Sequence, residues 1–203
     1  MSSWRERKKK MSWEFQLLDW FQTIRTPLLD EVVPIITTLG DNGYVWIALA
    51  ALLLAIPRTR KTGVIVAAAL ICDLILCNGI VKPLAHRIRP YDVNTDIVLL
   101  IKRLTDYSFP SGHTAASFAA VSALFCAGEK KLWKGSLVLA TAIALTRLYL
   151  YVHYPTDVLG GVLIGLLCGW LGCYIVKKAE PSFLLWLEKQ KAKKNPENKE
   201  FGE

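Results

Sequence analysis

The sequence has no Cys-x2-Cys pair, although it contains five cysteines. All five lie inside apolar runs, at positions 72, 77, 126, 168 and 173. Neither a zinc site nor a disulfide framework is therefore indicated. We expect these cysteines to serve as small packing residues.

A cleavable signal peptide and an internal repeat are also missing. The first ten residues are basic, but residues 13–20 (Trp-Glu-Phe-Gln-Leu-Leu-Asp-Trp) are amphipathic and carry acids. A signal peptide would have an apolar core at this point. We therefore predict that no cleavable signal peptide is present.

Acidic residues are scarce relative to basic ones, 17 against 25, which gives a formal net charge of +8. A basic chain can indicate a nucleic-acid partner, but these charges lie in short loops between apolar runs and in the tail. The basic positions are 58, 60 and 61, then 130, 131 and 134, then 177, 178, 189, 191, 193, 194 and 199. The positive-inside rule makes them cytoplasmic ends of membrane helices. We predict no nucleic-acid partner.

Apolar residues make up 53% of the chain, and the mean hydropathy is +0.31. They gather in runs at about 44–56, 62–81, 114–127, 135–152 and 158–176. A spanning helix needs ~20 residues. The pattern predicts an all-α, polytopic transmembrane helix bundle located in the cytoplasmic membrane.

The amino-terminal segment decides between five and six spans. Residues 12–24 are predicted to form an interfacial amphipathic helix, and residues 27–39 a second short helix ended by the turn at 40–43. Thirteen residues rise only ~20 Å, less than the ~30 Å hydrocarbon core. This favours five spans, whereas the basic run at 5–10 favours a cytoplasmic amino terminus and six.

The chain divides into three predicted regions. Residues 1–43 carry the basic amino terminus and the interfacial or re-entrant helices, residues 44–178 form the transmembrane domain, and residues 179–203 are a basic cytoplasmic tail. The polar segment 91–109 is predicted to cap a site on the extracytoplasmic face.

Three islands of polar residues lie at the ends of apolar runs, where charges are costly. They are Lys82-x6-Arg89-Pro90, the segment Pro110 to His113, and Arg147-x5-His153-x3-Asp157. With the basic loops in the cytoplasm, alternation of the spans brings all three to the opposite, extracytoplasmic face. We therefore predict one shared site that handles an anion.

The second island, Pro-Ser-Gly-His, comes directly before an apolar helix. The N–H groups of a helix start bind phosphate. Gly112 lets the backbone approach an oxyanion, and Ser111 adds a hydroxyl donor. A plain helix cap also explains the serine and glycine, so the prediction rests on the other islands.

The first island supplies cations. Arg89 suits a bidentate phosphate clamp and Lys82 a point charge. If the helix were continuous the two would share one face, together with Asn78. Arg87, His86 and Lys102 are predicted to be ordinary surface groups.

In the third island, Pro155 ends the outward helix near His153. Thr156 is predicted to cap the next helix, with Asp157 in its first turn. The Asp157 carboxylate can then accept a hydrogen bond from one imidazole nitrogen and leave the other as a nucleophile. Asp73, in the middle of a span, is predicted to pair with a cation or a backbone donor.

In this order and spacing, the three islands resemble the type 2 phosphatidic acid phosphatase family of membrane lipid phosphatases. The resemblance covers residues 82–157 directly, and the helical pattern from 44 to 176 fits around it. One position differs: the family usually has serine before the third-island arginine, and this chain has Thr146, which keeps the hydroxyl.

The resemblance implies a role for each island residue. His153 would attack phosphorus and form a phosphohistidine, Asp157 would orient it, and His113 would protonate the leaving oxygen. The remaining residues would bind the phosphoryl oxygens: Lys82, Arg89, Ser111, Gly112 and Arg147. No metal or other cofactor is expected, because the cations replace a metal ion and no carboxylate cluster suits Mg²⁺.

The expected substrate is a lipid phosphate or diphosphate held in the bilayer. A short chain without an accessory domain favours undecaprenyl diphosphate. Phosphatidylglycerophosphate and phosphatidic acid remain alternatives, and so does phosphoryl transfer to another lipid by the same site. A non-catalytic binding protein is disfavoured because the motif residues are intact. Burial in a membrane bundle disfavours a haloperoxidase.

Overall fold

A computed structural model describes residues 12–194, with side chains described from 13 to 179, and these residues form helices without a strand. The basic run at 5–10 and the end of the tail lie outside this range. In chain order the elements are α2 (Ser12–Thr23), α3 (Pro27–Leu39), η1 (Asp41–Gly43), α4 (Tyr44–Ala55), η2 (Pro57–Thr59), α5 (Arg60–Asp73), η3 (Leu74–Val81), α6 (Lys82–Ala85), α7 (Pro90–Val93), α8 (Gly112–Cys126), α9 (Leu132–Tyr149) and α10 (Pro155–Lys194). The all-α prediction is confirmed.

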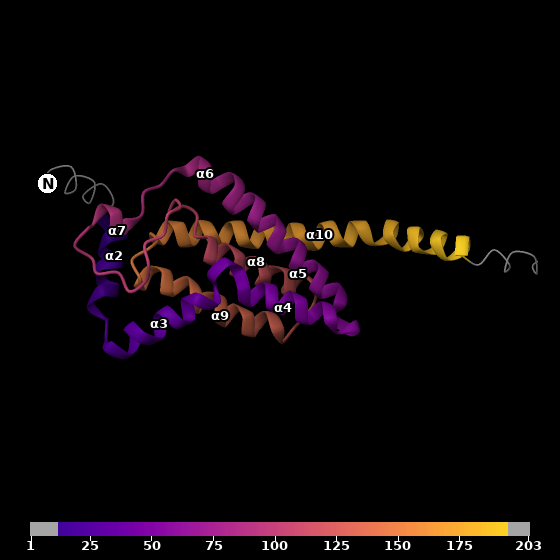
Figure 1. Ribbon diagram of the computed structural model, residues 1–203, viewed down its shortest axis with the longest axis horizontal. Helices are drawn as coiled ribbons and strands as arrows, with labels where there is room; N and C mark the ends of the chain where they lie inside the picture. The colour runs from indigo at the N-terminus through magenta and orange to yellow at the C-terminus, as the bar shows by residue number, and fades with distance from the viewer. Residues whose placement is uncertain (1–11, 195–203) are drawn as a thin grey trace, which may run out of the picture.

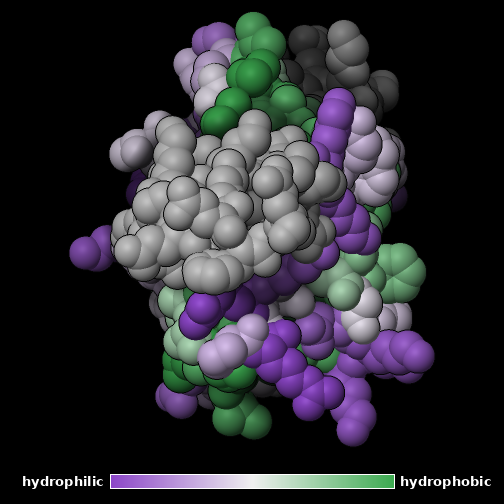
Figure 2. Space-filling model, turned by 90° about the vertical axis from the view of Figure 1, so that its right-hand side faces the viewer, coloured by the Kyte–Doolittle hydropathy of each residue, from purple (hydrophilic) through white to green (hydrophobic). Residues whose placement is uncertain are grey.

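The helices form an elongated bundle whose long axis follows α10 (Figure 1). Helix α8 packs along α10, α5 contacts both of them, and α4 and α9 pair with α5 and α8. At one end of the bundle lie α2 and α7, and at the other lies the α4–α5 turn (Figure 1). Figure 2 faces this second end and shows hydrophilic residues gathered there beside hydrophobic ones.

Glycines allow α10 to lie almost in backbone contact with α8. A Cβ atom at Gly161 would lie 2.7 Å from the Ser111 carbonyl oxygen, and one at Gly165 would run into the Ala115 carbonyl. Small residues four apart share a helix face and are typical of tightly packed membrane helices. This contact fixes the first turn of α10 beside the start of α8, where the Ser111 N–H donates to the Asp157 carbonyl at 3.0 Å.

Two apolar clusters fill the bundle. The larger one, in the middle of the helices, includes Trp46, Val66 and Leu124. The smaller one includes Phe15 of α2 and Tyr151 and Tyr154 of the α9–α10 connection. Helix α2 is thereby packed onto the end of the bundle.

The outer surface carries many exposed large apolar side chains. Examples from several helices are Leu52, Ile71, Leu74, Phe125, Val138, Leu163 and Trp170. By length and composition, Pro57–Val93 and Pro155–Ala179 are able to cross a membrane, and α3 with α4 form a third candidate bent by 43°. Helix α8, at 15 residues, is apolar but shorter. A membrane location follows.

Two helix boundaries differ from the predictions. The helix expected at 62–82 runs on through a π-helical stretch, η3, and ends at Ala85, so Pro83 does not break it. Helix α9, expected to reach 152, ends at Tyr149, and Tyr151 takes a left-handed conformation with φ 59°. Helix α9 therefore ends four residues before His153, earlier than Pro155 alone would require.

Candidate active site

A cavity of about 820 Å³ is lined by residues of η1, α4, α5, η3 and the start of α8, among others. Six of the eight predicted site residues line it, and they come from all three islands: Lys82, Arg89, Gly112, His113, Arg147 and His153. The predicted convergence of the islands is therefore confirmed. Ser111 and Asp157 lie behind the cavity wall, both fully buried.

Ser111 is the N-cap of α8. Its Oγ accepts a hydrogen bond from the Thr114 hydroxyl at 3.0 Å, in the helix cap rather than in the cavity. Gly112, the next residue, lines the cavity. A Cβ atom there would lie 3.2 Å from Asn78 Oδ1 and 3.6 Å from Lys82 Nζ, so the glycine leaves room for these side chains at the helix start.

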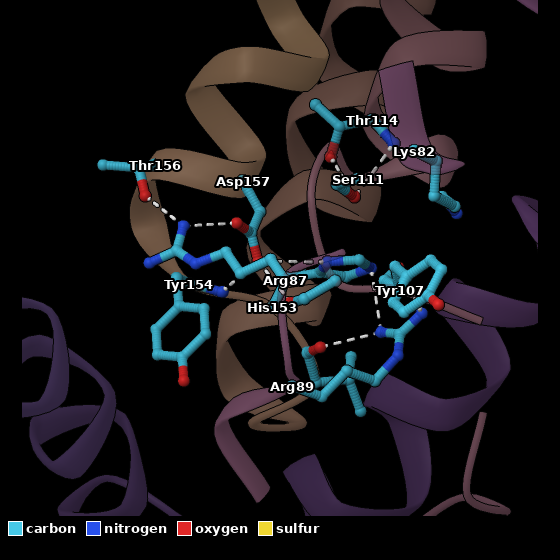
Figure 3. Close-up of polar contacts among 12 residues, drawn as sticks. Lys82, Arg87, Arg89, Tyr107, Ser111, Thr114, His153, Tyr154, Thr156 and Asp157 are labelled. Carbon is cyan, nitrogen blue, oxygen red and sulfur yellow. Dashed lines mark hydrogen bonds and ion pairs between the residues drawn. The ribbon is translucent and has the colours of Figure 1, made fainter. Parts of the chain in front are cut away.

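His153 is buried in the connection between α9 and α10, with both ring nitrogens directed at charged groups (Figure 3). Nε2 lies 3.3 Å from Arg89 Nη1. Nδ1 lies 3.5 Å from Asp157 Oδ2 and makes no hydrogen bond to any described residue. This arrangement favours the tautomer with a proton on Nδ1, facing the carboxylate, and a lone pair on Nε2 at the cavity.

Burial keeps the His153 ring neutral. Loss of hydration lowers its pKa to about 3, and the positive charges of Arg89 and Arg147 act in the same direction against the opposing effect of Asp157. A neutral imidazole at pH 7 has the free lone pair that a nucleophile needs.

Asp157 lies in the first turn of α10, and its carboxylate accepts hydrogen bonds from three donors. Oδ2 accepts hydrogen bonds from Ser108 Oγ at 2.5 Å and from the Tyr154 N–H at 2.9 Å. Oδ1 accepts one from Arg87 Nη1 at 2.5 Å (Figure 3). The carboxylate that faces His153 is therefore fixed from several sides, and no motif or spacing pointed to Ser108.

The prediction that Arg87 is an ordinary surface cation is wrong. Besides Asp157, its guanidinium bonds the buried carboxylate of Glu14 at 2.7 Å and lies 3.9 Å from the Tyr154 ring centre. The reason is that the helix ends at Ala85 and His86 adopts φ 46°, which turns the following residue inward.

Thr156 is not the helix cap that we predicted, because α10 already begins at Pro155 and Thr156 is its second residue. Its hydroxyl donates to Glu14 Oε1 at 2.6 Å and accepts from Arg87 Nη1 at 2.6 Å. Glu14 lies on α2, so the amino-terminal helix takes part in holding the start of α10.

The two cations of the first island meet at a carboxylate that the sequence did not single out. Lys82 Nζ lies 2.5 Å from Asp106 Oδ2, and Arg89 Nη2 lies 2.6 Å from Asp106 Oδ1. They do not share a helix face, because the helix ends between them and Arg89 is extended. Partial burial would raise the pKa of Asp106, but Lys82 and Arg89 outweigh this and lower it to about 2.

The guanidinium group of Arg147 is buried, and only part of its hydrogen-bonding capacity is used. Its side chain is 1% exposed, and Nη1 donates to Thr37 Oγ1 at 2.5 Å. Nε and Nη2 have no hydrogen-bond partner among the described residues. Buried donors without partners are costly, and an anion in the adjoining cavity would satisfy them.

His113 is the second residue of α8, and its Nε2 lies 2.8 Å from Asp41 Oδ1 of η1. The carboxylate is separated from the histidine by 72 positions in the chain. No spacing signal connects such residues, so sequence reasoning missed Asp41, which it treated only as part of a turn.

The cavity continues from its polar end along an apolar wall. The residues of this wall come from α4, α5 and η3: Ile47, Ala50, Ala67, Leu70, Ile71 and Leu74. Asp73 also lines it; its Oδ1 is buried without a hydrogen bond to any described residue, and Lys82 is the cation whose charge acts on it. A charged head and an apolar chain could occupy the two ends together.

Among residues 12–194, no group of three or more His, Cys, Asp and Glu side chains is placed to hold a metal ion. Positive charge in the cavity comes instead from Lys82, Arg89 and Arg147. These side chains suit a phosphate group, since two of them offer planar guanidinium donors.

Comparison with known proteins gives a consistent set of similarities. The model of the PAP2 superfamily matches residues 62–181. The chain is 32% identical over 142 residues to an undecaprenyl-diphosphatase of Sulfolobus acidocaldarius, covering 68% of each chain. It is 32% identical over 177 residues to a lipid A 4'-phosphatase of Bacteroides thetaiotaomicron, covering 80% of this chain and 76% of the relative.

The fold is also similar to a solved structure. A crystal structure from Bacillus subtilis, described as the first transmembrane PAP2 type phosphatidylglycerolphosphate phosphatase, aligns with a TM-score of 0.68 and 27% identity. The alignment covers 84% of this chain and 87% of the other. The helical architecture described above is therefore similar to that of a solved transmembrane protein.

Proposed function

The chain belongs to the PAP2 superfamily, and from this premise we propose that it is a metal-independent membrane lipid phosphatase that works through a phosphohistidine. The observation that carries the proposal is the pair of unsatisfied Arg147 nitrogens beside the neutral His153 ring. Together they offer an anion site and a nucleophile in one cavity. No residue outside the cavity is needed to contact the phosphoryl group.

In the first step, the Nε2 lone pair of His153 attacks phosphorus. A P–N bond forms as the bond from phosphorus to the leaving oxygen breaks, and His113 gives that oxygen its proton. Asp157, whose Oδ2 lies 3.5 Å from Nδ1, stabilises the positive charge that develops on the His153 ring. The product of this step is a phosphohistidine and a dephosphorylated lipid.

In the second step, water replaces the lipid. His113, now neutral, takes a proton from the water as its oxygen attacks phosphorus, and the P–N bond breaks with its electrons returning to Nε2. Inorganic phosphate leaves and both histidines regain their starting states. Charge spreads over the phosphoryl oxygens in both steps, and Lys82, Arg89, Arg147 and the Gly112 N–H stabilise it. Ser111 supports this helix start through its cap.

The apolar wall of the cavity supports a lipid as the substrate. A phosphate held at Arg147 would direct the attached chain toward Leu70 and Leu74, where burial of apolar surface stabilises it. We propose undecaprenyl diphosphate first, the substrate named in the Sulfolobus relative. Phosphatidylglycerophosphate and phosphatidic acid are the alternatives, as substrates of the same chemical class.

The charge distribution supports a topology. We propose five spans, an extracytoplasmic cavity and a location in the cytoplasmic membrane, with 44–178 as the spanning domain between the 1–43 and 179–203 regions. The basic loops at 58–61 and 130–134 follow the ends of α4 and α8, whereas Gly112 and His113, which line the cavity, lie at the opposite end of α8. Cysteine labelling at an introduced residue 96 and at residue 60 tests this: only residue 96 should react with an impermeant reagent in intact cells.

The activity test uses purified protein in detergent with EDTA. Undecaprenyl diphosphate, phosphatidylglycerophosphate and phosphatidic acid are offered separately, and released phosphate is measured. His153→Asn should abolish release, whereas His86→Asn, which removes an exposed histidine near the same face, should keep it. The proposal fails if no lipid yields phosphate, if His153→Asn stays active, or if activity requires Mg²⁺.

A further inference from the structure

The ring of His113 is enclosed by the turn between α3 and α4. One of its edges carries Nε2, which lies 2.8 Å from Asp41 Oδ1, and Cδ2, which lies close to the backbone of Gly40. A Cβ atom at Gly40 would lie only 2.9 Å from Cδ2. The turn therefore fits against the ring and leaves no room for a larger residue at position 40.

The backbone of this turn is shaped to present Asp41 to α8. Asn42 and Gly43 adopt left-handed conformations, with φ 49° and 71°, and α3 and α4 meet at a bend of 43°. Asparagine and glycine are the residues that tolerate such angles best. A continuous helix in this place would carry the carboxylate past the histidine.

A second set of contacts fixes the same histidine from the helix side. Ser117 Oγ donates to the His113 carbonyl at 2.7 Å, and Trp46 Nε1 donates to Ser117 Oγ at 2.9 Å. Trp46 belongs to α4, which begins where the turn ends. Ring and backbone of His113 are thus both tied to the α3–α4 region.

The charges around His113 come from three elements. Arg147 of α9 and His153 of the α9–α10 connection line the same cavity as His113. Asp41 of η1 is the carboxylate that bonds the ring directly, at 2.8 Å. Because Asp41 occupies Nε2, the nitrogen on the other edge, Nδ1, is left for a substrate.

We propose that Asp41 is the positioning residue of His113, a role that rests on the proposed function. Asp41 accepts the Nε2–H bond, fixes the ring and favours its protonated form. The Nδ1 proton passes to the leaving oxygen as the bond from phosphorus breaks, and the neutral ring keeps its Nε2–H on Asp41. In the second step Nδ1 takes a proton from water, which restores the starting state.

The test exploits leaving groups of different acidity. An alcohol leaving from dioctanoyl phosphatidate needs a proton, whereas the phosphate monoester leaving from farnesyl diphosphate is already a stable anion near neutral pH. We expect Asp41→Asn to lower kcat on the phosphatidate about tenfold to a hundredfold and to change the diphosphate rate much less. The alkaline limb of the kcat profile should move to lower pH, and Asp41→Glu should restore most of the rate.

Asp96→Asn is the matched control, since it makes the same chemical change at an exposed position of the loop between α7 and α8. Each variant is first shown to keep the elution volume and Tm of the wild type. An unmoved alkaline limb in folded Asp41→Asn, or equal losses on both substrates, would overturn the proposal. If His113→Asn shows the leaving-group pattern and Asp41→Asn does not, the inference fails while the proposed function stands. If the wild type releases no phosphate from either lipid, the proposed function itself fails.

Discussion

Asp106 Oδ1 lies 2.6 Å from Arg89 Nη2, so a carboxylate of the loop after α7 holds one of the phosphate-binding cations proposed above. Lys82 bonds the other oxygen of the same carboxylate. The Asp106 side chain is about half exposed, at 49%, and reaches the cavity from its rim. A phosphate that binds both cations must displace this carboxylate or share them with it.

Removing the Asp106 charge should therefore strengthen phosphate binding. For Asp106→Asn we expect the inhibition constant of inorganic phosphate to fall about threefold to tenfold, because a partly exposed ion pair is worth roughly 1 kcal/mol. Inhibition of lipid hydrolysis by added phosphate measures it. Asp92→Asn, an exposed acid of α7, should leave the constant unchanged, and a weaker phosphate affinity in Asp106→Asn would argue against competition.

The pH dependence of stability should reveal the buried neutral His153. Its pKa of about 3 in the folded protein lies below the ordinary value of 6.5. Below about pH 6.5, His153 of the unfolded chain therefore binds a proton, whereas His153 of the folded protein stays neutral until the pH approaches 3. The contribution to stability is complete above pH 6.5 and falls as the pH drops toward 3. Thermal unfolding in detergent at several pH values should show a smaller loss for His153→Asn than for wild type, and parallel curves would contradict it.

Arg87 should matter for catalysis although it does not line the cavity. Arg87→Gln removes the donor to Asp157 Oδ1 and leaves buried Glu14 without its cation. We expect kcat to fall roughly tenfold or more, equivalent to about 1.4 kcal/mol of transition-state stabilisation, with little change in KM. Arg103→Gln, an exposed arginine paired with Asp92, is the control. Equal kcat values for the two variants would show that Arg87 does not contribute to catalysis.

The close contact of α8 and α10 should depend on Gly165. Gly165→Leu forces a side chain into the Ala115 backbone, and such overpacking costs about 1–3 kcal/mol or more. Gly135→Leu on α9 makes the same change where nothing lies within 4 Å of the new Cβ atom. A lower Tm for the first variant alone is expected, and a similar Tm for both would show that the helices have room to separate.

The sequence was informative where chemistry and local spacing coincide. The three islands could be predicted to converge, because their cations and histidines lie at the ends of apolar runs and alternation of the spans places these ends together. Gly112 and His113 could be placed at a helix start from the Pro-Ser-Gly-His pattern alone. Each island, and the helix start within the second one, is recognised from residues that are close to one another in the chain.

Long-range partners could not be predicted. Glu14 reaches Arg87 across 73 positions, and Asp41 reaches His113 across 72. Each of these acids has an unremarkable local context, one in an amphipathic helix and the other in a turn. The left-handed residue His86, which turns Arg87 inward, also carries no sequence signal, since only a few per cent of residues other than glycine adopt a positive φ.

Detection of the covalent intermediate is the most direct test of the proposed phosphohistidine mechanism. Wild-type protein is mixed with a lipid phosphate or diphosphate that it hydrolyses, quenched in alkaline denaturant within one turnover, digested and analysed by mass spectrometry. We expect a phosphoryl group on the peptide containing His153, absent from His153→Asn and present in His113→Asn when the leaving group is a phosphate monoester. A phosphoryl group on His113, or on no histidine at all during active turnover, would contradict this mechanism.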